Sequence, residues 1–295
     1  FFLQRFDAYN NDVKCRGAIA LANALSNQQF QTSLQRVNLG RNWIGNDGAI
    51  AFANALQHLS SLTHLNLDFN NIGDAGAIAM GNALLVKRKS HPSLKYLCLS
   101  SNSIGNHGVT AIARALQQQQ QDDAGGGLEF LALAYTKITG KGAIAMAKAL
   151  EQNTCLASLE LDHTEIGTVG IKAIANALQT KNCTLKSLVL EGCRISNASA
   201  LAMARAMKFN SSLQHLVLSC VVTPANADPW MHAISFNVGL LWETTEARTR
   251  ARRQLCFSMP LWHQSTLFCL GSSQAEAMRG LFESHERLEQ NVMQQ

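Results

Sequence analysis

The sequence predicts an α/β solenoid in which a short strand and a helix alternate along the chain. Leucines spaced as LxxLxLxxN recur along the chain, most completely over residues 62–70, and each copy is followed by an alanine-rich segment with helical spacing. The copies mostly start 28 or 29 residues apart, stretching to 32 and 34 across two insertions. Because one such unit cannot bury its apolar side alone, we expect the copies to stack and share a continuous core.

The leucine pattern predicts the strands. In the most complete copy, Leu65 and Leu67 alternate as a short strand requires. Asn70 follows the strand, where an amide that both donates and accepts hydrogen bonds can join neighbouring turns. Ile72 is expected in the core. We expect eight units ending near Val221, because the pattern has seven further copies, the first imperfect, starting at Leu3, Leu34, Leu94, Leu128, Leu156, Leu185 and Leu213.

The alanine-rich segments predict the helices. In the segment 76–84, Ile78, Met80, Ala83 and Leu84 fit a helical spacing, and the alanines would let the helix approach its neighbours closely. Equivalent segments start at Gly17, Gly48, Gly108, Gly142 and Gly170, and a degenerate one starts at Ala198.

The asparagine position changes along the chain. It holds asparagine in the first four units and then Thr136, Thr164, Cys193 and Val221. Threonine can still donate and accept, cysteine does so weakly, and valine cannot. We therefore expect the last two units to be less regular.

The repeated phrase resembles the leucine-rich repeat of the ribonuclease-inhibitor-like subtype, which also occurs in the sensing domains of NOD-like receptors and in Ran GTPase-activating proteins. The resemblance covers residues 1–222, about three quarters of the chain. It implies a horseshoe with parallel strands on the concave face and helices on the convex face. It does not identify the ligand, because a fold does not fix a function.

The rest of the chain, residues 223–295, is expected to be a mainly helical C-terminal cap. The period is lost after Pro224. We expect an edge strand at 234–238 and helices at 243–255 and 274–292. The exposed end of a solenoid needs a cover, so we interpret this tail as a lid and not as an independent catalytic domain. Since the chain starts with Phe1 and not with Met, we expect it to be a fragment.

Composition limits the function classes. A net charge of +5 with 15% charged residues is mildly basic, without the dense Lys/Arg footprint of a nucleic-acid binder. No apolar run reaches the ~18 residues of a membrane span. Eight scattered cysteines lack metal-ligand spacing, which favours reduced thiols in a cytoplasmic protein. The sequons at Asn182, Asn197 and Asn210 are interpreted as structural and unglycosylated, because two of them, at Asn182 and Asn210, lie in a helix-to-strand joint, where asparagine can take the left-handed conformation.

No motif predicts catalysis. The sequence contains no GxSxG, GxxxxGK[ST], HExxH or GxGxxG pattern. Asp162 and His163 suggest an acid–base pair, but both are at repeat positions that simply face solvent. We therefore expect no enzyme activity, no cofactor and no metal.

The variable positions beside the strand leucines point away from the core and form the candidate binding surface. Aromatic residues make up only 6% of the chain, yet four of them are expected together on this face. Strand positions favour aromatic residues in any case, but exposed aromatics beside charges are also typical of interface hot spots. The candidate residues are Arg36, Arg41, Phe69, Tyr96, Phe130, Tyr135, Glu160, Asp162 and Glu191.

These residues predict a non-enzymatic, monomeric scaffold that binds a protein partner on its concave face, and no small-molecule substrate. The partner would carry an apolar anchor and a basic flank that reaches Glu160, Asp162 and Glu191. Three alternatives stay open: the sensing end of a NOD-like receptor-type protein, a GTPase regulator, and a nucleic-acid binder that uses the basic tail. The basic stretch 248–253 weakens the second, because Ran GTPase-activating proteins carry an acidic tail.

Overall fold

The computed structural model divides into two compact units, Phe1–Phe257 and Ser258–Gln295. It describes five segments, all in the first unit, which are residues 3–26, 33–85, 94–119, 126–179 and 184–218. The expected C-terminal cap, with its edge strand and two helices, and the end of the array at Val221 lie outside these residues.

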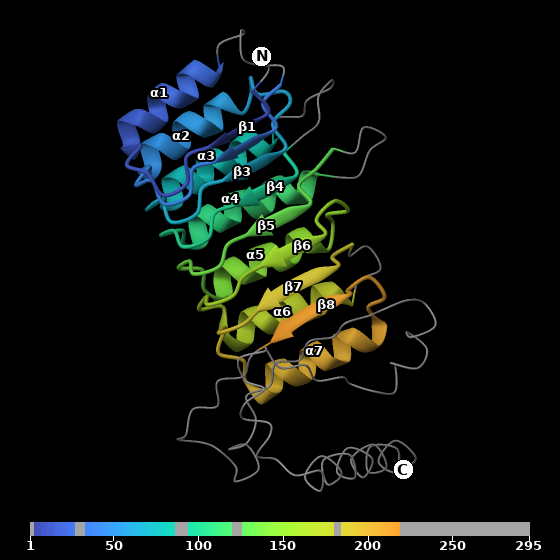
Figure 1. The fold of residues 1–295 in the computed structure, drawn as a ribbon. Helices are drawn as coiled ribbons and strands as arrows, with labels where there is room; N and C mark the ends of the chain where they lie inside the picture. Colours follow the sequence, from blue (N-terminus) through green and yellow to red (C-terminus); the bar gives the residue numbers. More distant parts are fainter. Residues whose placement is uncertain (1–2, 27–32, 86–93, 120–125, 180–183, 219–295) are drawn as a thin grey trace, which may run out of the picture. The chain divides into compact units, whose positions relative to one another are not determined.

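Strands and helices alternate throughout the described chain (Figure 1). Eight strands form one parallel sheet in chain order, so each strand pairs with its neighbours along the chain. The strands are β1 (Arg5–Asp7), β2 (Arg36–Asn38), β3 (His64–Asn66), β4 (Tyr96–Cys98), β5 (Phe130–Ala132), β6 (Ser158–Glu160), β7 (Ser187–Leu190) and β8 (His215–Leu218).

The helices lie side by side along one face of this sheet (Figure 1). They are α1 (Lys14–Ser26), α2 (Gly45–Ala55), α3 (Asp74–Leu85), α4 (Asn106–Gln118), α5 (Gly140–Leu150), α6 (Gly167–Leu178) and α7 (Asn197–Phe209). The predicted α/β solenoid of stacked strand–helix units is therefore confirmed.

The core lies between the sheet and the helices. Leu65, Leu97 and Leu131 are paired in register across three strands, and all three are fully buried. Ile72 and Met80 fill the space behind them and are also fully buried. Each repeat therefore covers the apolar side of the next, as the periodicity predicted.

Ile78, one of the apolar residues that fit the helical spacing of this segment, is 37% exposed. The buried side of α3 consists of Gly76, Ala77, Met80 and Gly81. A Cβ atom at Gly81 would lie only 2.7 Å from the backbone carbonyl carbon of Ala111, so α4 packs directly against this glycine. The glycines set the contact face of α3, and Ile78 turns to solvent.

The buried asparagines link successive repeats as expected. The Oδ1 atom of Asn70 accepts hydrogen bonds from the backbone of Asn42 and Ile44, at 2.9 and 3.2 Å. In contrast, Thr136 donates to the Leu133 carbonyl within its own turn, at 2.7 Å. The last strands nevertheless stay regular, because β7 and β8 pair over four residues. The expected irregularity is therefore wrong for these two strands.

The asparagines in the helix-to-strand joints act by a different mechanism from the expected one. Asn210 has φ −76° and ψ 127°, an extended conformation and not a left-handed one. Its Nδ2 donates to the Leu178 carbonyl of the previous repeat at 2.7 Å, and its Oδ1 accepts from the Leu213 nitrogen at 2.7 Å. Asn153 makes the same pair of contacts, to Leu116 and Leu156. These two side chains tie their joints to the helix of the previous repeat.

Candidate functional site

The face of the sheet opposite the helices, here called the strand face, is covered by none of the described helices (Figure 1). On a strand such as β3, the middle residue Leu65 is buried and the two flanking residues are partly exposed. Parallel register aligns the first residues of the strands in one row across the face. This first row consists of Arg5, Arg36, His64, Tyr96, Phe130, Ser158, Ser187 and His215.

Three rings of the first row stack on one another. The centroids of Tyr96 and Phe130 are 4.3 Å apart with an interplanar angle of 6°, and those of His64 and Tyr96 are 5.5 Å apart at 21°. These distances follow from the ~4.8 Å spacing of neighbouring strands. Burial lowers the pKa of His64, and the charges of Arg36 and Arg5 lower it further. The row therefore presents a continuous aromatic strip with a histidine of lowered pKa at one end.

A second row, here called the turn row, follows the ends of the strands. Its residues adopt left-handed backbone conformations, with φ of 56° at Arg41, 53° at Phe69, 54° at Tyr135 and 53° at His163. This conformation is unfavourable for bulky side chains. It is held by hydrogen bonds to the next repeat, such as the one from the Tyr135 nitrogen to the Asp162 carbonyl at 2.9 Å.

The turn directs these side chains to the surface. Phe69 is 47% exposed and Tyr135 is 56% exposed. The Arg41 guanidinium lies 4.4 Å from the centroid of the Phe69 ring, and the rings of Tyr135 and His163 stack at 4.3 Å. The exposed rings of Phe69 and Tyr135 are thus each packed against a side chain from an adjacent repeat.

The four predicted aromatic residues therefore form two separate groups and not one patch. Tyr96 and Phe130 are in the first row, whereas Phe69 and Tyr135 are in the turn row with Ser101 between them. The sequence does not reveal this division, because it depends on the left-handed turn that follows each strand.

Small residues lie between the two rows. Cys98, Ala132 and Ala134 are 8%, 1% and 5% exposed, although Cys98 and Ala132 are third residues of strands and lie on the strand face. Burial, with smaller contributions from the nearby Cys98 and Glu160, raises the pKa of Tyr96 to about 12. The Tyr96 hydroxyl thus belongs to a half-buried environment that extends toward the acidic residues of the next repeats.

The acidic candidates gather beyond the aromatic strip. Burial raises the pKa of Glu160, and the charge of Asp162 adds to the effect. Burial also raises the pKa of Asp162, with a further contribution from Glu191. Among the described residues, none of these three forms an ion pair. The charge of the neighbouring His163 acts in the opposite direction and lowers the pKa of Asp162. The three carboxylates form an acidic patch that can accept a cationic group.

The basic candidates lie at the other end of the strand face. Arg36 is exposed in the first row beside Arg5, and Arg41 covers Phe69. The first row thus carries arginines at β1 and β2, whereas the acidic candidates are Glu160 in β6 and the residues Asp162 and Glu191, which follow β6 and β7. The structure does not bring Arg36 or Arg41 together with Glu160.

Two residues outside the predicted set contribute to these groups, namely His64 and His163, which stack on the predicted tyrosines. Their register positions, equivalent to those of Tyr96 and Tyr135, could have identified them. Trp43 was also missed; it is 63% exposed in a left-handed turn two residues after Arg41.

The described segments contain no group of three or more His, Cys, Asp or Glu side chains that could hold a metal ion. Within the same segments, the helices are too short or too polar to cross a membrane.

Comparison with known proteins agrees with this architecture. A family model described as "Leucine Rich repeat" matches six segments, at residues 30–53, 58–81, 90–113, 128–147, 152–175 and 181–204. Pig ribonuclease inhibitor is 29% identical over 131 residues, which is 44% of this chain and 28% of the inhibitor.

Human proteins with further domains also match. The human "NACHT, LRR and PYD domains-containing protein 5" is 33% identical over 128 residues, 43% of this chain and 10% of the relative. The human "NACHT, LRR and PYD domains-containing protein 2" is 32% identical over 190 residues, 64% of this chain and 17% of the relative. The matched segments span less than a third of each of these three relatives.

Proposed function

Because the chain is a leucine-rich repeat protein of the ribonuclease-inhibitor-like subtype, we propose that it is a non-enzymatic scaffold that binds a protein partner on its strand face. The observation that carries this proposal is the aromatic strip of His64, Tyr96 and Phe130 beside an acidic patch whose carboxylates form no ion pair among the described residues. We place the protein in the cytoplasm as a monomer, which fits its free thiols at Cys15, Cys98 and Cys193.

The geometry defines what the partner must offer. An apolar or aromatic anchor would pack on the strip of Tyr96 and Phe130, whose rings are already ordered by stacking and lose little entropy on binding. A lysine or arginine beside that anchor would reach Glu160 and Asp162. These carboxylates lie in a half-buried environment that disfavours their charged form. A cation from the partner would therefore offset the free-energy cost of keeping them charged there.

The test starts with a partner purified by capture on the immobilised chain and identified by mass spectrometry. Its dissociation constant is then measured against the wild type, Tyr96→Ala, Tyr135→Ala and Glu160→Gln. We expect Tyr96→Ala to weaken binding tenfold or more, since hot-spot aromatics contribute about 2 kcal/mol or more.

The matched control is Phe209→Ala, which removes an aromatic ring that is 71% exposed on α7. Its dissociation constant should stay within twofold of the wild type. Unchanged binding by both tyrosine variants, or an equal loss in the control, would exclude the strand face as the binding surface.

A second candidate is the sensing end of a NOD-like receptor-type protein. It is favoured by the 32–33% identity to the two human NACHT-containing relatives. This candidate requires a nucleotide-binding domain in the same polypeptide. Sequencing the complete transcript tests it, and a reading frame without such a domain would contradict it.

A further inference from the structure

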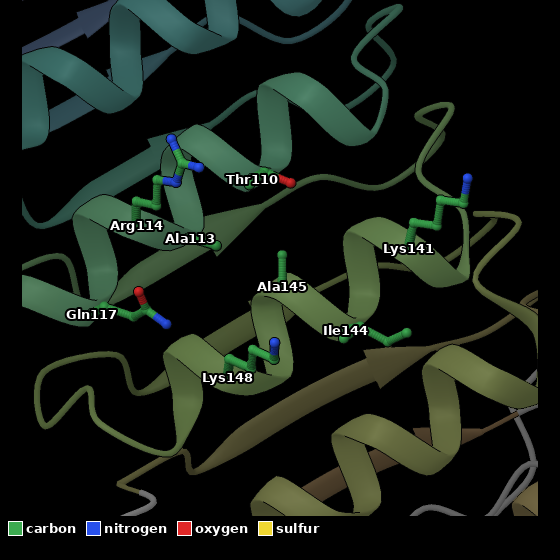
Figure 2. Close-up of a pocket in the computed structure, with 8 residues that line it drawn as sticks. All are labelled: Thr110, Ala113, Arg114, Gln117, Lys141, Ile144, Ala145 and Lys148. Carbon is green, nitrogen blue, oxygen red and sulfur yellow. The ribbon is translucent and has the colours of Figure 1, made fainter.

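A groove lies between α4 and α5, on the helical side of the sheet and away from the strand face (Figure 2). Its volume is about 320 Å³. Ala113 from α4 and Ile144 and Ala145 from α5 line it with apolar surface. Ala113 is buried, whereas the two residues of α5 are half-buried, so the groove is open to solvent.

The packing of the two helices explains this hollow. A Cβ atom at Gly142 would lie 2.6 Å from the Cγ1 atom of Val109, so the start of α5 packs closely against α4. One turn further along, Ala113 and Ala145 have only methyl side chains. The backbones are held close, but these small side chains do not fill the space above them.

The rim of the groove is basic. Figure 2 shows Arg114 on α4 and Lys141 and Lys148 on α5 around the two alanines. All three cations are exposed, and none of them makes an ion pair within the described residues. No carboxylate lines the groove.

This charge is a special feature of the α4–α5 pair. Arg114 and Lys148 occupy the same repeat position, six residues after the recurrent glycine of each helix. The equivalent residues of the other described helices are Asn23, Asn54, Asn82, Asn176 and Arg205. Within the part of the chain that the structure describes, only α4 and α5 place two cations at this position on adjacent helices.

We propose that this groove binds an acidic segment of a second protein partner, independently of the strand face. One apolar side chain of the segment would rest on Ala113 and Ala145. Carboxylates on either side of it would pair with Arg114, Lys141 and Lys148. Charge complementarity indicates the occupant, because three cations without an ion-pair partner among the described residues attract an anionic segment.

The lining favours a peptide over a nucleic acid. No aromatic ring lines the groove, so bases would have no surface on which to stack. Apart from Lys141, which is the second residue of α5, the lining residues lie on the bodies of two helices, where backbone N–H groups are used within the helix and cannot bind phosphate. Long lysine and arginine side chains can instead reach separate carboxylates while their stems cover the apolar residue.

The probe is a fluorescein-labelled peptide in which one leucine is flanked by glutamates three and four residues away on each side. Its binding to the full chain is measured by fluorescence anisotropy. An exposed ion pair changes affinity by about two- to fivefold, so removing three should weaken binding about tenfold or more. The test variant carries Arg114→Gln, Lys141→Gln and Lys148→Gln.

The matched control removes three exposed cations elsewhere, as Lys186→Gln, Arg194→Gln and Arg205→Gln. We expect it to change the dissociation constant less than twofold. A second variant, Ala145→Glu, puts a carboxylate into the groove and should abolish binding. Thermal melting of each variant must match that of the wild type.

Three results would overturn the proposal: no binding of the peptide to the wild type, equal weakening in both triple variants, or tighter binding of a homopolymeric RNA through the same three residues. The variant Tyr96→Ala should leave peptide binding unchanged, so the groove and the strand face are tested separately.

Discussion

The side chain of Asn102 holds the backbone of Asn70 in the neighbouring repeat, with its Oδ1 atom 3.0 Å from the Asn70 nitrogen. The same oxygen accepts a hydrogen bond from the Ile72 nitrogen at 2.8 Å. The Nδ2 atom of Asn102 donates to the carbonyl oxygens of Leu67 and Leu99. These contacts are buried and exclude water. One side chain therefore satisfies backbone groups of two repeats at once.

Replacing this residue should be costly. Asn102→Ala leaves several buried backbone groups without a partner, at about 1–3 kcal/mol for each, so the free energy of unfolding should fall by about 3 kcal/mol or more. The comparison is Thr136→Ala at the equivalent position, where only one hydrogen bond is lost and the expected cost is about 1 kcal/mol. Urea unfolding of both variants checks this difference, and equal losses would contradict it.

Close contact between α3 and α4 gives a second prediction. A Cβ atom at Gly81 would lie 2.7 Å from the Ala111 carbonyl carbon and 2.9 Å from the Ile112 nitrogen. Backbone atoms cannot move aside cheaply, so Gly81→Ala should lower the free energy of unfolding by about 1–3 kcal/mol. This outcome opposes the helix propensity of alanine, which alone would add about 1 kcal/mol.

The control for Gly81→Ala is Asn82→Ala at the next, exposed position of the same helix. Helix propensity there should raise stability by about 0.5 kcal/mol, because no packing opposes it. A stabilising effect of Gly81→Ala in the same urea titration would mean that the two helices do not touch at this point.

The sequence predicted the fold because the same residues recur at the same positions. Strand leucines such as Leu65 and Leu97 fix the register, since each must meet its copy in the next repeat. The exposed side chain of Ile78 shows the limit of this reasoning. Apolar periodicity selects the larger side chains, whereas the contact is made through Gly81, which carries no side chain.

The candidate site was only partly predictable. Alternation along the strands indicates that Tyr96 and Phe130 face outward, and their stacking follows from strand spacing. The grouping of Tyr135 with His163 depends on a left-handed turn, which no glycine marks in that repeat. The partner cannot be read from either pattern, because it depends on chemistry outside this chain.

The acidic patch gives a pH-dependent prediction. Glu160 should titrate above its ordinary pKa of 4.5, chiefly because of burial and also because of the Asp162 charge. NMR titration of the carboxyl carbons measures this directly. Asp162→Asn should lower the pKa of Glu160 but leave it above 4.5, since burial remains. A Glu160 pKa at or below 4.5 in the wild type would contradict the half-buried patch.

The raised pKa of these carboxyls also sets the sign of their effect on stability. The folded state binds the protons of these carboxyls more tightly than the unfolded state does. Their contribution to the free energy of unfolding is therefore fully present below the ordinary pKa, and it is lost as the pH rises through the raised pKa of the folded state. At pH 7, Asp162→Asn should therefore raise the free energy of unfolding, by less than about 1 kcal/mol because the groups are half-exposed. The gain should disappear near pH 3, and an equal effect at both pH values would contradict this assignment.

Cys98 offers a chemical probe of the aromatic strip. It is the third residue of β4, on the same side of the strand as Tyr96, and it is only 8% exposed. Burial also raises the pKa of its thiol, which reduces the reactive thiolate fraction at neutral pH. Native Cys98 should therefore react slowly with iodoacetamide.

Removing the neighbouring ring should open this site. In Tyr96→Ala, the thiol gains access to solvent and its pKa falls toward the ordinary value, so alkylation of Cys98 should accelerate about fivefold or more. Peptide mass spectrometry over time follows each cysteine separately. Cys193 is the internal control, because it is fully buried in a turn where its Sγ donates to the Leu161 carbonyl at 3.1 Å. An unchanged Cys98 rate would show that Tyr96 does not cover it, whereas an equal increase at Cys193 would mean that the substitution had opened the repeat array itself.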